Sequence, residues 1–329
     1  MASRLTKPFC GIAALSLCLV ATSAAAQPAA PTIILLGTAG GPPAHADRSQ
    51  PATLLRIGPK NYLIDAGENV GQQLVRAGVP ARALSDIFLT HLHWDHLLGL
   101  GYLMATGWMT NRSEPLPVWG PPGTSRYISS EKTALSEGED IFRAQSPERP
   151  ALSSLYPAKE ITVGDAPVEI YADALVRVRA VANTHFSKIH SPPHDYGVDR
   201  SYAYRFDTAQ GSVVFTGDTG PSTAVTKLAK GADVLVTEVC DLKSIKATML
   251  KLQPASTIDK LVQHMAEQHL SPDEVGRMAE AAGVRKVVLT HFVAGANFDP
   301  THLLPAIRAR FKGEIVLGKD LLEVPVRGE

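Results

Sequence analysis

Short apolar runs recur along almost the whole chain, and they restrict its possible folds more than any other feature. Each run has the length of a β-strand, is rich in β-branched residues and is bounded by Gly, Pro, Asp or Asn. The runs cover residues 32–36, 53–57, 62–64, 87–89, 168–171, 176–181, 202–206, 213–216, 234–236, 287–289, 315–317 and 321–324. Strands with apolar faces must be buried against other layers, so the sequence predicts packed sheets.

Four helical patterns lie between these runs, at residues 70–77, 222–230, 257–268 and 272–282. The fourth follows a capping residue, Ser271, and ends before a glycine stop, Gly283. Strands come in runs in each half of the chain, with helices between the later ones. This order predicts an α/β fold in which two face-to-face sheets carry helices on both outer faces, a four-layer αββα sandwich.

The N-terminus has the pattern of a secretory signal peptide. Arg4 and Lys7 precede an apolar run at residues 9–21, and residues 24–26 offer a small-x-small cleavage site. The apolar run is shorter than the roughly 20 residues that span a bilayer, which disfavours a membrane anchor. We therefore expect residues 1–26 to be removed, leaving a periplasmic or secreted domain of residues 27–329.

Composition adds three expectations. The chain has 32 basic and 32 acidic side chains, so no basic excess points to nucleic acid. Cys10 and Cys18 lie in the signal, and a lipoprotein signal at Cys18 fits its neighbours poorly, so only Cys240 is left and is expected in the core. Residues 111–167 are rich in proline, and they predict a helix and an insertion loop that covers one face.

The motif "THLHWDH" follows the strand at residues 87–89. It places His91, His93, Asp95 and His96 within six residues. Imidazole nitrogens and carboxylate oxygens are the ligands that zinc prefers outside thiolate sites. Strand ends also project side chains into the crevices where α/β proteins hold their chemistry. The motif therefore predicts a metal site. Trp94 within it is expected to pack on the metal loop, with substrate binding as the alternative.

Three later strands also end in ligand-type residues: "VANTH" in His185, "FTGDT" in Asp218 and "LTH" in His291. With the motif they make seven candidate ligands, too many for one tetrahedral zinc and suited to two metals that share a carboxylate. His190 and His194 compete with His185 for its place, and His185 is preferred because it follows its strand directly.

The chain resembles metallo-β-lactamase-fold hydrolases, and within them the ribonuclease Z and arylsulfatase-like branch. The resemblance covers nearly all of the expected mature chain. It is carried by "LGTAGGP" at residues 36–42, "YLIDAGE" at 62–68, "THLHWDHLLGL" at 90–100, "VWGPPGT" at 118–124, "FTGDT" and "LTHF".

The resemblance implies roles for single residues. One zinc would be held by His91, His93 and His185. The other would be held by Asp95, His96 and His291. Asp218 would bridge the two ions, with Asp65 orienting a ligand imidazole. Manganese or iron could replace zinc. His269 resembles the branch's general acid and Glu238 its carboxylate partner, so Asp95, His269 and Glu238 are the expected catalytic residues. The alternative makes His269 an exposed residue beside a helix.

Water between two divalent ions can have a pKa of about 7, so the site would supply hydroxide for hydrolysis. We expect an exported zinc-dependent hydrolase of phosphodiesters or sulfate esters, with a lactonase or carboxylic ester hydrolase as the alternative. The export signal and the lack of a recognisable tRNA-gripping arm disfavour a ribonuclease Z-type endonuclease. A non-catalytic metal-binding protein is disfavoured by the complete ligand set. The expected partner is a small-molecule ester and not nucleic acid. We expect no stable membrane anchor, and a homodimer is compatible with the sequence.

Overall fold

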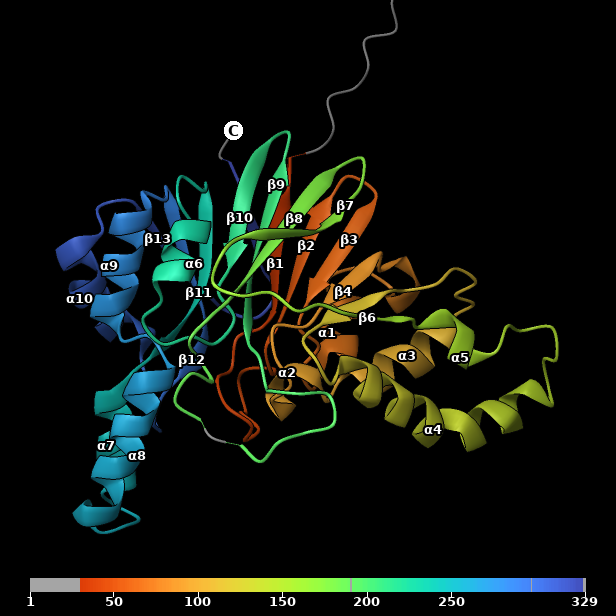
Figure 1. The fold of residues 1–329 in the computed structure, drawn as a ribbon, viewed down its shortest axis with the longest axis horizontal. Helices are drawn as coiled ribbons and strands as arrows, with labels where there is room; N and C mark the ends of the chain where they lie inside the picture. Colours follow the sequence, from red (N-terminus) through yellow and green to blue (C-terminus); the bar gives the residue numbers. More distant parts are fainter. Residues whose placement is uncertain (1–29, 190, 297, 328–329) are drawn as a thin grey trace, which may run out of the picture.

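The computed structural model describes residues 30–189, 191–296 and 298–327, which form two seven-stranded sheets (Figure 1). The expected signal peptide at residues 1–26 lies outside the described residues. The first sheet has the order β14 (Leu322–Pro325), β1 (Thr32–Gly37), β2 (Ala52–Ile57), β3 (Lys60–Ile64), β4 (Asp86–Phe88), β5 (Val118–Gly120) and β6 (Ala158–Glu160). The second has the order β13 (Glu314–Leu317), β12 (Lys286–Val293), β11 (Val234–Cys240), β10 (Gly211–Phe215), β9 (Tyr202–Thr208), β8 (Val176–Ala182) and β7 (Val168–Ala172).

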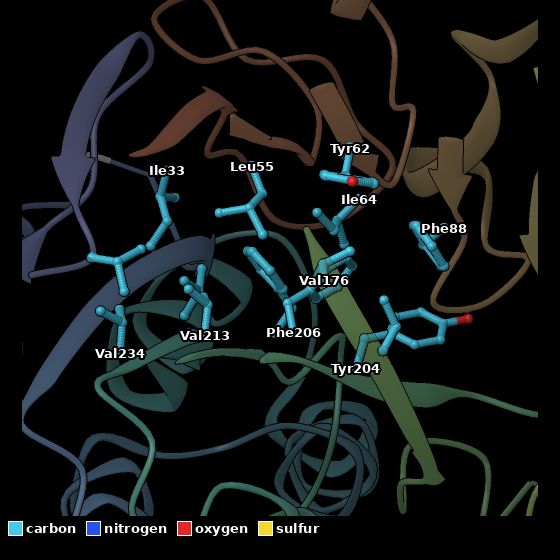
Figure 2. Packing of buried hydrophobic residues seen from close by; sticks show 14 of the residues in the cluster. Ile33, Leu55, Tyr62, Ile64, Phe88, Val176, Tyr204, Phe206, Val213 and Val234 are labelled. Carbon is cyan, nitrogen blue, oxygen red and sulfur yellow. The ribbon is translucent and has the colours of Figure 1, made fainter. Parts of the chain in front are cut away.

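The two sheets pack face to face around an aromatic-rich core. Figure 2 shows side chains of the first sheet, including Leu55 and Phe88, facing Phe206 and Val213 of the second. The rings of Phe88 and Phe206 meet edge to face, with centroids 5.2 Å apart. Such pairs favour edge-to-face geometry because the ring edge is positive and the face negative.

Helices cover the outer face of each sheet. Alternate residues of a strand point to opposite faces, so Ile33 lies between the sheets while Ile34 packs under the helices. The first sheet is covered by α1 (Val70–Arg76), α3 (Leu100–Met109), α4 (Thr124–Arg143) and α5 (Leu152–Leu155). The second is covered by α6 (Thr223–Leu228), α9 (Pro272–Ala282) and α10 (Leu304–Arg310). The predicted αββα sandwich is therefore confirmed.

Two helices stand apart from these layers. Figure 1 shows α7 (Leu242–Met249) and α8 (Ala255–Gln268) as a pair that projects from one end of the second sheet. The sequence predicted α8 but not α7 or α3. Helix α3 buries a face that includes Leu103 and Trp108, but its exposed face also carries large apolar side chains, Tyr102 and Met109. It therefore lacks the contrast between apolar and polar faces on which a period-based prediction depends.

Residues 111–167 form part of the first half of the sandwich. They contribute β5 and β6 to the sheet edge and α4 and α5 to its helical layer. Helix α4 is attached through its apolar face, where the ring of Phe142 lies 6.4 Å from that of Trp108 in α3. The predicted helix is present as α4.

Candidate metal centre

The topology brings the candidate ligands to one end of both sheets. Strands β8 and β10 each run antiparallel to β9, and β12 runs parallel to β11 and β10, so β8, β10 and β12 point the same way. His185 and Asp218 follow the ends of β8 and β10, and His291 lies near the end of β12. The motif after β4 of the first sheet meets them there, with Asp95 and His96 inside the single turn α2 (Trp94–Leu97).

Two groups of ligand-type atoms form at this end, each with its atoms within 4.8 Å of one another. The first contains His91, His93, His185 and Asp218. The second contains Asp95, His96, Asp218 and His291. Asp218 belongs to both, with one carboxylate oxygen toward each. Its Oδ2 lies 3.9 Å from His91 Nε2, and its Oδ1 lies 3.3 Å from His291 Nε2. This arrangement could hold two cations around a shared carboxylate.

Hydrogen bonds from outside the two groups orient the imidazoles. His96 Nδ1 lies 2.8 Å from Asp65 Oδ2, which directs Nε2 of the same ring into the second group. His185 Nδ1 lies 3.0 Å from the carbonyl oxygen of Gln268. Thr90 Oγ1 lies 3.0 Å from His91 Nδ1 and donates to Asp65 at 2.9 Å. Partners of this kind fix ring orientation and raise the basicity of the nitrogen that faces a metal.

The backbone is distorted where two of these residues sit. Asp65 has φ 60° and His291 has φ 43°, a left-handed conformation that non-glycine residues rarely adopt. The pairing of β11 with β12 also shifts register between Thr237 and Val239, which brackets Glu238. Strain and bulges of this type persist where the surrounding structure holds them, and they are common at functional sites.

Electrostatics in the cluster favour bound cations. Burial alone would raise the pKa of Asp218, but the imidazoles of His291 and His96 hold it well below its usual range. Burial of the His96 ring has the opposite effect and lowers its pKa. The charges of Asp218 and Asp65 outweigh burial, so the pKa of His96 lies well above its usual value. The carboxylates thus favour positive charge here. Buried His91 Nε2 and Asp218 Oδ1 have no hydrogen-bond partner among the described residues, as expected of metal-facing atoms. The donor set fits two divalent cations.

His269, which is partly exposed, and the buried Glu238 form a hydrogen-bonded pair beside the cluster. His269 Nδ1 lies 2.7 Å from Glu238 Oε2, and the backbone N–H of Thr219 donates to Glu238 Oε1 at 2.6 Å. Burial lowers the pKa of His269, but the charge and hydrogen bond of Glu238 outweigh it and raise the pKa to about 9. The ring of His269 lies 5.0 Å from that of His185, so the pair adjoins the first group.

A pocket of about 390 Å³ opens beside the cluster. His93, Asp95, His185, Asp218, His269 and His291 form its polar side. Leu92, Trp94, Met265 and Val293 line its apolar side. A pocket of this size, with convergent polar groups and shifted pKa values, is the expected setting of an active site.

The seven candidate ligands, Asp65, and the pair His269 and Glu238 are thus all brought together. The competing residue His194 is not, because its ring stacks on Tyr196 at 4.6 Å, away from the cluster. His190 lies outside the described residues. Cys240 is buried, as expected. Sequence reasoning missed Thr90 and the carbonyl of Gln268, since small hydroxyl and backbone groups carry no distinctive pattern.

The expectation that Trp94 packs on the metal loop is wrong. Its side chain is 68% exposed. Trp94 opens the short helix α2, where Asp95 and His96 turn inward as the buried residues. The first position of the turn is therefore directed to solvent.

The family model described as a β-lactamase superfamily domain matches residues 60–292. The chain belongs to the metallo-β-lactamase superfamily. This superfamily member is 34% identical over 299 residues to a protein of Mycobacterium bovis named ribonuclease Z, covering 89% of this chain and 98% of the relative. The ribonuclease Z of Mycobacterium avium is 32% identical over 298 residues, covering 89% and 98% of the two chains.

Solved structures show the same fold. The metallo-β-lactamase fold protein YhfI from Bacillus subtilis has a TM-score of 0.64 at 20% identity, covering 90% of this chain and 99% of that one. The short form of human tRNase Z has a TM-score of 0.61 at 20% identity, with the same coverage. The resemblance to the ribonuclease Z branch that the motifs indicated is confirmed.

The predicted partner is wrong. A small-molecule ester without nucleic acid was expected, whereas the relatives that align with nearly the whole chain are named for a ribonuclease. The expectation rested on the balanced net charge, on the export signal and on the lack of a recognisable tRNA-gripping arm. A net charge reports the sum of the surface charges and not their distribution. Within the described residues, none of the helices is both long and apolar enough to span a membrane.

Proposed function

We propose that this protein is a zinc-dependent hydrolase that cleaves phosphodiester bonds in RNA. The observation that carries the proposal is the double His/Asp cluster around Asp218, in a chain that aligns along nearly its whole length with ribonuclease Z. RNA takes the place of the small ester that the sequence predicted.

The residues of the two groups would hold the metal ions. His91, His93 and His185 would ligate one zinc, while Asp95, His96 and His291 would ligate the other, with Asp218 between them. Two divalent ions bound there would lower the pKa of water from 15.7 to about 7 and stabilise negative charge on the attacked phosphate. Asp65 keeps the ring of His96 in place through the bond from Nδ1.

His269 is the proposed proton donor to the leaving oxygen. Glu238 engages its Nδ1, which leaves Nε2 to face the pocket that His269 helps to line. Glu238 raises the pKa of His269 to about 9, which favours the protonated ring that a proton donor requires. The second oxygen of Glu238 is held by the backbone of Thr219, so the carboxylate is fixed while it orients the ring. A histidine oriented in this way is a suitable general acid.

The helical pair α7 and α8 supplies local positive charge despite the balanced total. Residues 242–268 contain four lysines and two acidic residues. The lysines are Lys243, Lys246, Lys251 and Lys260, and all four are exposed. Lys246 is paired with Asp259 at 2.9 Å. Lys260 lies on α8, which ends next to His269, whereas Lys243 and Lys246 lie on α7 and Lys251 lies between the two helices. These charges would favour the phosphates of RNA that approaches along the helical pair.

The test is cleavage of synthetic RNA by the purified protein at full zinc occupancy, with a tRNA precursor among the substrates. Hydrolysis by water does not need the 2′-hydroxyl, so a single 2′-deoxy nucleotide at the cleavage position should leave cleavage intact. Asp218→Ala should abolish it, while Asp165→Ala, at an exposed carboxylate, should not. No cleavage of any RNA by zinc-loaded protein would refute the proposal.

A further inference from the structure

We infer that Trp94 forms a stacking platform for a nucleobase next to the scissile phosphate. The inference rests on the proposed function, because it names how the same site would recognise its substrate. It starts from the finding that a tryptophan expected to be packed is exposed at the edge of the metal pocket.

The indole is large and exposed, on a backbone that is held in a turn. Trp94 is 68% exposed, although it lies between two candidate ligands, His93 and Asp95. The backbone of α2 is fixed on both sides, since Leu98 N–H donates to the carbonyl of Trp94 and His96 N–H donates to that of His93, each at 3.0 Å. These bonds fix the backbone from which the indole projects, and a tryptophan has only two side-chain torsions to order when a ligand covers it.

Three further apolar side chains line the same pocket as the indole. Leu92 comes from the same loop, Met265 from α8, and Val293 from the end of β12. Methionine adapts its shape and makes favourable contacts with aromatic rings. A flat apolar group entering the pocket would therefore meet Trp94 and Met265 while a group attached to it reached Asp218 and His269.

RNA provides such a group at every position. The base attached to a nucleotide beside the scissile phosphate is flat and aromatic, and any base has a face that can stack on an indole. Stacking requires no particular sequence, so Trp94 would strengthen binding of RNA generally. A sugar phosphate without a base would reach the metal centre but leave the indole exposed.

Calorimetric titration of the zinc-loaded protein compares adenosine 5′-monophosphate with ribose 5-phosphate. The two probes share the phosphate, so contacts with the metal centre cancel in the ratio of their affinities. Stacking of one base predicts that the adenosine compound binds roughly 5- to 150-fold more tightly. Trp94→Ala should remove this preference and Trp94→Phe should retain part of it. Equal binding of both probes by the unaltered protein would overturn the inference.

Tyr102→Ala is the matched control. Tyr102 is an aromatic residue of similar exposure, 63%, but it lines a separate groove with Val75 and Leu98. Its removal should leave the preference unchanged. If both substitutions instead alter the oligomeric state in light scattering and neither alters nucleotide binding, the indole belongs to a contact between copies of the chain, and the inference is wrong.

A second readout uses RNA that lacks one base. Trp94→Ala should raise KM for normal RNA by a factor similar to the affinity ratio of the two probes. The increase in KM should disappear when the nucleotide on one side of the cleaved bond is abasic. An effect that persists with an abasic nucleotide on either side would contradict stacking. If the unaltered protein cleaves no RNA, the proposed function fails, while the calorimetric comparison still decides the role of Trp94.

Discussion

Asp65→Asn tests whether Asp65 contributes to zinc affinity separately from its contribution to the stability of the fold. The Asp65 carboxylate accepts a hydrogen bond from the N–H of Thr90 at 2.7 Å and one from Thr90 Oγ1 at 2.9 Å. It also lies 2.8 Å from His96 Nδ1. Asparagine keeps the size of the side chain and tolerates the φ of 60°, which alanine would not do without strain.

The expected loss has two parts. Removal of the carboxylate charge weakens the orientation and basicity of the His96 ring, and changes of this kind reduce metal affinity by about 10- to 100-fold, or about 1.4–2.8 kcal/mol. The new NH₂ group must also face either His96 Nδ1–H or a donor of Thr90. One buried donor is then left without an acceptor, which costs about 1–3 kcal/mol of folding free energy.

Asp320→Asn is the control for the second part alone. The Asp320 carboxylate accepts from Thr38 N–H at 3.0 Å, Ser49 N–H at 2.7 Å and Gln73 Nε2 at 2.9 Å. It contacts none of the candidate ligands in these hydrogen bonds. The same change of oxygen to NH₂ should therefore lower the free energy of unfolding without weakening zinc binding.

The assay combines zinc titration against a chromophoric chelator with urea unfolding of the metal-free protein. We expect both variants to lose stability and only Asp65→Asn to lose zinc affinity. Zinc binding by Asp65→Asn equal to that of the unaltered protein would refute the orienting role. Equal loss of zinc affinity in both variants would show that the effect comes through the fold.

Four further predictions concern the centre and the N-terminus. Elemental analysis of protein reconstituted with zinc should find about two ions per chain, and Asp218→Ala should lower that content and abolish hydrolysis. His269→Ala should keep the metal and lose about 10²- to 10⁴-fold in rate on alkoxide leaving groups, but little on an activated nitrophenolate; equal loss on both would remove it from the acid role. His269 must be protonated to act as the acid, and its pKa is raised to about 9. Hydrolysis of the alkoxide substrate should therefore decline at alkaline pH, at or below a pH of about 9 because bound cations oppose protonation of the ring. The decline should be absent in His269→Ala. We also propose that the protein is exported, so mass spectrometry should find a mature chain beginning near Gln27, and an intact N-terminus on a cytoplasmic protein would contradict this.

The sequence by itself predicted the fold class and the ligand-type residues that gather at one end of the sheets. A continuous apolar strand such as β1 and a strand with an apolar face such as β8 must be buried against other layers, and this predicts the sandwich without knowledge of contacts. Ligand-type residues at strand ends, such as His185 and Asp218, converge because parallel strands end at one edge of a sheet. Both inferences depend on local patterns.

Only the tertiary structure decided which neighbours each of these residues would have. The hydrogen bonds of Asp65 to Thr90 and His96 join segments 25 and 31 residues apart, and the carbonyl that orients His185 comes from a helix 83 residues away. Exposure of Trp94 was equally hidden, because a motif shows which residues are adjacent but not which way a single helical turn directs them. Distances and exposure depend on long-range packing, which a pattern of residue types does not contain.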